Sequence, residues 1–150
     1  MEGQNYLKSK SNILCLLASL VVMVACTKND KKQFDMIFSS ESGIDFVNMV
    51  VGNDDANILD YQYFYNGGGV SVGDINNNSL PDLFFTSNQH DNALYLNLGN
   101  LKFKNITEKA GVAGNSDWNT GSVMADVNGD SFLDIYVMAV VGVCGFEGRN

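Results

Sequence analysis

Short apolar stretches separated by Gly- and Asn-rich turns dominate the chain from residue 69 onward. Residues 69–73 alternate apolar with small side chains, as a β-strand with two different faces does. Further short apolar runs follow, each separated from the next by turn-forming residues. The pattern predicts strands at residues 69–73, 83–86, 93–97 and 103–107. Helical periodicity is nearly absent, so we expect an all-β fold.

The expected strands follow one another in meander order, which is typical of one blade of a β-propeller. The pattern then restarts at an offset of 52 residues, where Gly69 falls on Gly121 and Asp74 falls on Asp126. The second copy predicts strands at residues 122–125 and 134–140 and lacks an outer hairpin. We therefore expect one complete four-stranded blade plus partial blades, in a fragment of a longer protein, with repeat cores at residues 66–107 and 118–150.

A weaker similarity lies upstream of the first repeat. Ser42-Gly43-Ile44 resembles Ala110-Gly111-Val112, which follows the fourth expected strand. This similarity predicts that residues 33–46 form the end strand of another blade, as the terminal strand of a closed propeller often does.

Two segments with the same spacing of oxygen-bearing side chains carry the clearest candidate chemistry. Each places Asp or Asn at offsets 0, 2, 4 and 8, with a backbone carbonyl expected to contribute at offset 6. This spacing lets a short loop wrap a hard cation such as calcium. The predicted ligands are Asp74, Asn76, Asn78, Leu80 and Asp82 in the first segment, and Asp126, Asn128, Asp130, Phe132 and Asp134 in the second.

Neither segment matches an EF-hand, because offset 11 is Phe85 or Val137 instead of Glu and the flanking runs are strand-like. The second segment has three carboxylates and the first has two, so we expect calcium to bind more tightly around Asp126. The alternative is that these turns only make Asx-type hydrogen bonds at strand ends. Two copies in the same phase favour the calcium interpretation.

Several other side chains allow more than one interpretation. Tyr61, Tyr63 and Tyr65 are expected to share one strand face, where they either pack in the sheet or stack on sugars. Trp118 is expected to pack between blades, with sugar contact as the alternative. His90 lies in a polar run and is expected to be exposed, and Cys144 is expected to be a buried free thiol.

The N-terminus resembles a lipoprotein signal peptide. Lys8 and Lys10 precede an apolar run at residues 13–25 that is too short to span a membrane comfortably. The run ends in small residues before Cys26, as a bacterial lipobox does. We expect a signal peptide at residues 1–25, lipidation of Cys26 and a polar tether at residues 26–37. An ordinary secretory signal or a membrane anchor is the alternative.

Charge and composition exclude some classes of function. The formal net charge is −8, and an acidic surface disfavours nucleic acid, whose binding depends on cationic side chains. The sequence has one histidine and no arrangement typical of a nucleophile, a nucleotide loop or a zinc site. We therefore expect a protein without enzymatic activity.

The segments 68–84 and 124–136 resemble FG-GAP/VCBS repeats, the calcium-binding blades of integrin α-subunit propellers and of many bacterial surface proteins. The lipobox, Asn66-Gly-Gly-Gly69 and Asn92-Ala-Leu-Tyr-Leu-Asn97 resemble cartilage-acidic-protein-like lipoproteins, whose longer members carry an ASPIC/UnbV domain. The resemblance covers residues 38–150 and implies a seven-bladed or similar propeller with calcium in its loops. The literal Phe-Gly and Gly-Ala-Pro signatures are absent from this sequence.

The expected function is binding or adhesion at a cell surface. A lipid anchor would hold the protein on a bacterial outer membrane, where the propeller would bind a glycan or a protein partner. The alternative is an accessory or catalytic component of polymer uptake or degradation, whose active groups would lie in blades beyond this chain.

Overall fold

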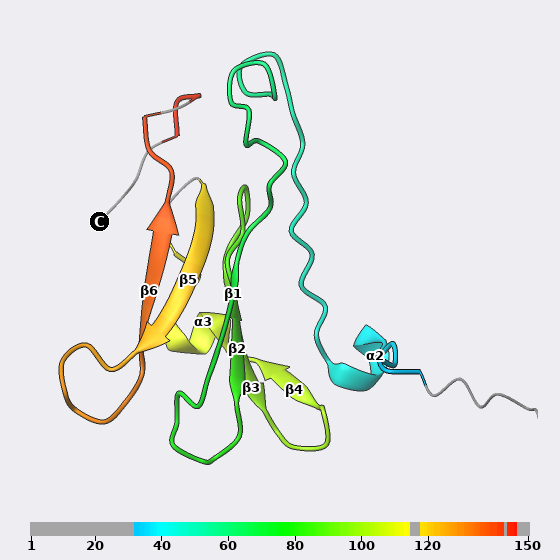
Figure 1. Ribbon diagram of the computed structural model, residues 1–150, viewed down its shortest axis with the longest axis vertical. Helices are drawn as coiled ribbons and strands as arrows, with labels where there is room; N and C mark the ends of the chain where they lie inside the picture. Colours follow the sequence, from blue (N-terminus) through cyan, green and yellow to red (C-terminus); the bar gives the residue numbers. More distant parts are fainter. Residues whose placement is uncertain (1–31, 115–117, 143, 147–150) are drawn as a thin grey trace, which may run out of the picture. The chain divides into compact units, whose positions relative to one another are not determined.

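The computed structural model describes residues 32–114, 118–142 and 144–146 (Figure 1). The chain divides into two units, Met1–Met36 and Ile37–Asn150, and every helix and strand described below belongs to the second. The expected signal peptide, Cys26 and most of the expected tether lie outside the described residues. Within the described part, no helix has the length and apolar character needed to cross a membrane.

The first repeat forms a four-stranded antiparallel sheet in the order in which its strands occur in the chain. Its register pairs Ser71 with Phe84 and Phe84 with Leu94, so these three side chains lie on one face of the sheet. Val70, Phe85 and Tyr95 belong to the opposite face. The strands are β1 (Val70–Gly73), β2 (Asp82–Phe85), β3 (Ala93–Asn97) and β4 (Phe103–Asn105).

The second repeat forms a two-stranded antiparallel sheet from β5 (Asn119–Ala125) and β6 (Asp134–Ala139). Its register pairs Met124 with Ile135 and Val123 with Tyr136, with an irregularity between Asn119 and Gly121. The expected strands were therefore placed correctly, although β5 begins earlier than residue 122. All six strands are antiparallel, as the meander pattern predicted.

The two sheets pack against each other through their first strands, because β1 lies beside β5 (Figure 1). The hydroxyl groups of Ser71 and Ser122 are hydrogen-bonded at 2.9 Å across this interface. A Cβ atom added to Gly69 would lie 2.8 Å from the Cα atom of Gly121. Gly69 therefore allows the two backbones to approach more closely than a side chain at this position would permit.

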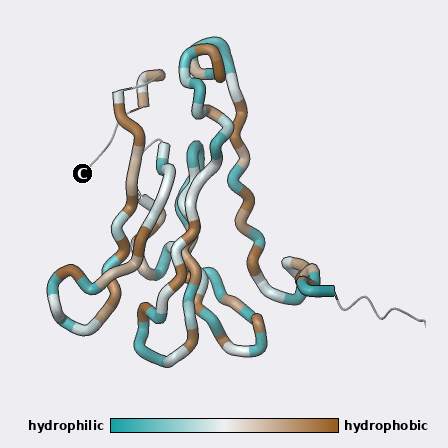
Figure 2. The backbone as a smooth tube through the Cα atoms, viewed as in Figure 1, coloured by the Kyte–Doolittle hydropathy of each residue, from teal (hydrophilic) through white to brown (hydrophobic). Residues whose placement is uncertain are grey.

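An extended segment at residues 44–51 packs on the opposite face of the four-stranded sheet. Its side chains alternate between buried or half-buried and exposed, although it pairs with no strand among the described residues. Most of this segment is apolar (Figure 2), and Val47, Met49 and Val51 are among its exposed positions. The ring of Phe46 stacks on that of Phe85, with 5.0 Å between their centroids. The first sheet therefore lies between this segment and the second sheet.

Two four-residue helices replace parts of the expected strands. The helix α2 (Ser39–Ser42) lies within residues 33–46, which contain no strand, so the expected end strand is wrong. The helix α3 (Thr107–Ala110) follows β4, which ends at Asn105. Gly43 and Gly111 end these helices with left-handed φ values of 77° and 68°. The similarity between the two segments therefore reflects a shared helix-ending glycine, which needs no Cβ atom to adopt this conformation.

An aromatic cluster surrounds Trp118, which is 1% exposed. Phe64 and Phe146 pack on its ring with centroid distances of 4.9 and 4.6 Å. Trp118 is therefore a packing residue, as expected, but these two contacts come from loop residues and not from a neighbouring blade. The expected tyrosine strand is wrong, because residues 61–65 form turns. Tyr61 packs against Trp118, whereas Tyr63 and Tyr65 are exposed.

Two further expectations concern single side chains. His90 is exposed, as predicted. Cys144 carries a free thiol, as predicted, but it is half-buried rather than fully buried. It packs at the edge of the cluster around Trp118.

Candidate cation-binding loops

The two predicted ligand segments connect neighbouring strands at the same end of the two sheets (Figure 1). The Asp74 loop, residues 74–82, joins β1 to β2, and the Asp126 loop, residues 126–134, joins β5 to β6. Each loop begins directly after β1 or β5, and its last residue is the first residue of β2 or β6. Strand pairing therefore brings offsets 0 and 8 of each loop close together.

In the Asp74 loop, every predicted side-chain ligand turns toward the backbone of the loop. Asp74 accepts hydrogen bonds from the N–H groups of Asn78 and Ser79, at 3.0 and 2.6 Å. Asn76 and Asn78 accept from the N–H groups two residues later, at 3.1 and 2.9 Å. Asp82 closes the loop by accepting from the N–H of Ile75 at 3.1 Å.

The Asp126 loop repeats each of these hydrogen bonds and adds one, from the N–H of Gly129 to Asp126 at 2.7 Å. Asp126 accepts from the N–H groups of Asp130 and Ser131, at 3.2 and 2.9 Å. Asn128 and Asp130 accept from the N–H groups two residues later, at 2.9 and 2.8 Å. Asp134 accepts from the N–H of Val127 at 3.0 Å. The two loops thus share a conformation and not only a sequence pattern.

The backbone of both loops also bends in the same way. Ser79 and Ser131, at offset 5, have left-handed φ values of 66° and 72°. At offset 3, Asn77 and Gly129 are left-handed too, with φ values of 58° and 78°. Asn and Gly tolerate this region well, whereas Ser adopts it at an energetic cost. The shared bends turn the alternate side chains inward in both loops.

The charge state of Asp126 suits a cation. Hydrogen bonds from backbone N–H groups, chiefly that of Ser131, hold the pKa of this exposed carboxyl below its ordinary value. The same N–H groups would favour any anion at this position, so they account for the ionised side chain without a metal. The loop is therefore arranged around a carboxylate that stays charged at neutral pH.

The donor set fits calcium better than a softer metal, since all the predicted ligands are oxygen atoms. Among the described residues, no three acidic, histidine or cysteine side chains gather closely enough to hold a metal by themselves. A cation would therefore need the amide oxygens and the backbone carbonyls of Leu80 and Phe132 as well. The Asx-type hydrogen bonds leave lone pairs free on the carboxylate and amide oxygens, so they are compatible with such binding.

Asp82 has a second role that the spacing did not reveal. Its side chain is fully buried, and it accepts a hydrogen bond from the N–H of Asn97 on β3 at 2.8 Å. Asp134, its counterpart in the Asp126 loop, is half-buried and makes only the bond to Val127 among the described residues. Asp82 therefore ties the first loop to the sheet as well as closing it.

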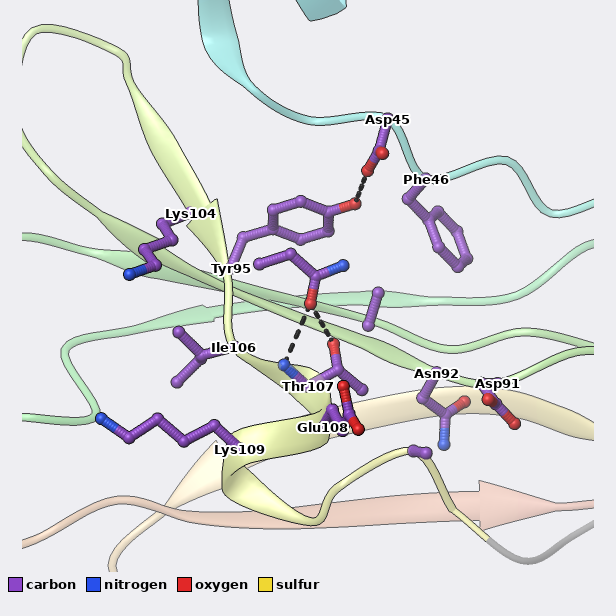
Figure 3. A pocket seen from close by; sticks show the side chains of 13 residues that line it. Asp45, Phe46, Asp91, Asn92, Tyr95, Lys104, Ile106, Thr107, Glu108 and Lys109 are labelled. Carbon is purple, nitrogen blue, oxygen red and sulfur yellow. Dashed lines mark hydrogen bonds between the residues drawn. The ribbon is translucent and has the colours of Figure 1, made fainter.

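A separate cavity of about 850 Å³, lined by both polar and apolar side chains, lies between residues 45–46, strands β3 and β4 and helix α3 (Figure 3). The hydroxyl of Tyr95 donates a 2.6 Å hydrogen bond to Asp45 at its edge. The ammonium groups of Lys104 and Lys109 lie on one side, away from Asp91. The sequence analysis missed this cavity, because the residues that line it are distant in the chain and follow no motif.

The ionisation of Tyr95 provides a test of the cavity edge. Burial and then the nearby Asp45 carboxylate raise the pKa of Tyr95 above its ordinary value. We expect Tyr95 to ionise above the ordinary tyrosine pKa in an ultraviolet titration, with Tyr95→Phe identifying its signal. Asp45→Asn should lower the pKa of Tyr95, and an unchanged value would contradict this explanation. The raised pKa means that the folded protein favours the protonated Tyr95. The resulting contribution to the free energy of unfolding is complete below about pH 10 and is lost as the pH rises through the pKa of folded Tyr95.

Comparison with known proteins gives a match to one family model over part of the chain. Residues 74–137 match the model of the FG-GAP-like repeat, from the first residue of the Asp74 loop to the interior of β6. No curated protein and no solved structure matches the chain significantly. The match covers both candidate loops and all six strands except β1 and the end of β6. The chain thus contains an FG-GAP-like repeat at residues 74–137.

Proposed function

We propose that this chain is a calcium-stabilised β-propeller module that serves in binding rather than catalysis. The observation that carries the proposal is the pair of loops that share sequence spacing, hydrogen bonds and backbone bends in two successive repeats. An isolated Asx-rich turn needs no such repetition. Two copies of one oxygen-lined loop at the same end of adjacent sheets favour a common ligand.

The way the two sheets pack supports the propeller. Ser71 and Phe84 face the second sheet and are 7% and 1% exposed. Their counterparts 52 residues later, Val123 and Tyr136, face away from the first sheet and are 49% and 64% exposed. A further sheet stacked on this face would repeat the contact that the first two sheets already make. Such repetition around an axis generates a propeller.

The proposed location rests on the lipobox-like motif before Cys26, and the proposed partner rests on the cavity beside Tyr95. Lipidation of Cys26 would anchor the protein to the bacterial outer membrane. The ligand we propose is a glycan or a protein that the propeller contacts at the cell surface. The cavity beside Tyr95 supports the glycan, because it offers amide, carboxylate and ammonium groups to a hydroxyl-rich molecule.

Calcium titration of the full chain by calorimetry tests the proposal. We expect two binding events in the wild type and the loss of the tighter one in Asp126→Ala, because that loop has three carboxylates. Asp74→Ala should remove the weaker event. Asp60→Ala removes one exposed carboxylate outside the loops and should leave both events in place. Unchanged binding in both loop variants would reject the proposed ligands.

A further inference from the structure

One hydrogen bond links the two loops directly. The side-chain amide Nδ2 of Asn77 donates to the backbone carbonyl of Ser131 at 3.0 Å. Asn77 is at offset 3 of its loop, so it is not among the predicted ligands. Its side chain extends from the Asp74 loop to the Asp126 loop, across the boundary between the two repeats.

The contact is made to the peptide unit that precedes a predicted ligand of the Asp126 loop, the carbonyl of Phe132. The carbonyl of Ser131 and the N–H of Phe132 belong to one planar peptide unit. Asn77 holds the carbonyl side of this unit, and Asp130 accepts from its N–H at 2.8 Å. The next carbonyl along the chain, that of Phe132, is a predicted cation ligand. Asn77 therefore helps to fix the orientation of the backbone that presents this ligand.

The Asp74 loop in turn controls the position of Asn77. Asn76 and Asn78, its neighbours on both sides, are predicted ligands of the first cation. A cation bound between them would hold the intervening backbone, and with it the amide that reaches Ser131. Ordering of the first loop would then reduce the entropy that the second loop loses on binding.

We propose that Asn77 couples the two loops, so that a cation in the Asp74 loop raises the affinity of the Asp126 loop. This inference rests on the calcium binding proposed above. The coupling is reciprocal, as linkage requires, so the second cation equally strengthens binding of the first. A single exposed hydrogen bond between neutral groups corresponds to a change of about two- to ten-fold in affinity.

The repeat itself supplies the substitution that tests the coupling. The counterpart of Asn77 in the second loop is Gly129, which has the same left-handed backbone and no side chain to reach a further loop. Asn77→Gly therefore removes the amide and keeps a residue suited to this conformation. Asn100→Gly is a matched control, because Asn100 is exposed, has a φ of 53° and lies in the turn between β3 and β4.

The experiment compares calcium affinity at the Asp126 loop with the first site intact and with it removed by Asp74→Ala. We expect Asp74→Ala to weaken the second site about two- to ten-fold in the wild-type and Asn100→Gly backgrounds. In the Asn77→Gly background, Asp74→Ala should leave the affinity of the second site unchanged. Equal weakening with and without Asn77 would overturn the coupling and leave the proposed calcium binding intact.

Hydrogen exchange gives a second measurement that does not depend on affinity. In the Asn77→Gly variant with calcium absent, the N–H of Phe132 should exchange faster than in Asn100→Gly, because its peptide unit is held on one side only. Unchanged exchange would contradict the proposed role of Asn77. Failure of either loop to bind calcium would reject the proposed function and the coupling together.

Discussion

Calcium at one hundred times its dissociation constant should raise the free energy of unfolding by about 2.7 kcal/mol for each occupied loop. For a folded region of this size, one such contribution corresponds to a rise in melting temperature of roughly 10 °C. The physical reason is that the folded loops converge their oxygen atoms, whereas the unfolded chain offers scattered ligands. Thermal unfolding followed by circular dichroism, with calcium and with chelator, measures the difference.

The variants separate cation binding from a general effect of charge. The double variant Asp74→Ala/Asp126→Ala should lose the calcium-dependent rise, whereas Asp60→Ala should keep it. Magnesium should stabilise the wild type less, because it demands a tighter octahedral shell and gives up water reluctantly. Equal melting temperatures of the wild type with calcium and with chelator would contradict calcium stabilisation.

Asp82→Ala should destabilise the fold by about 3 kcal/mol even when chelator removes calcium. The substitution deletes a buried carboxylate and leaves the N–H groups of Ile75 and Asn97 without their acceptors. Asp134→Ala, at the same position of the second loop, should cost only about 1 kcal/mol under these conditions, because it removes a single bond to Val127. Urea unfolding in chelator provides both values.

Calcium titration of the same two variants completes the comparison. Both carboxylates close a loop at offset 8, so each variant should lose the calcium site of its own loop. Asp82→Asn keeps one oxygen that can accept a hydrogen bond and should recover part of the stability lost in Asp82→Ala. Equal destabilisation by Asp82→Ala and Asp134→Ala would show that the bond to Asn97 contributes nothing measurable.

The local pattern of the sequence was enough to predict most of the first sheet. Residues 93–97 form β3 as expected, and both ligand segments connect strands as expected. The fourth strand was predicted to end at residue 107, but β4 ends at Asn105. Asn105 accepts hydrogen bonds from the N–H and hydroxyl of Thr107, and the chain then turns into α3. An Asn two residues before a Thr-Glu pair was the available signal for this turn.

Contacts between distant residues could not be predicted in the same way. Asn48 donates to Asn88 at 2.7 Å, and Tyr95 donates to Asp45, although each pair is 40 or more residues apart. The same reason explains why the spacing predicted Asp82 as a ligand but did not reveal its bond to Asn97. Side-chain hydrogen bonds of this kind depend on how the layers pack, and a single sequence carries no periodic signal for them.

The close approach of Gly69 and Gly121 has a consequence for how such chains evolve. Tandem duplication of one 52-residue unit would copy the glycine together with both sheet faces, so each added layer would inherit a surface that matches its neighbours. A side chain acquired at Gly69 would instead push two backbones apart and disturb every later layer. Lineages should therefore vary more readily in the number of units than in the residues that set their spacing.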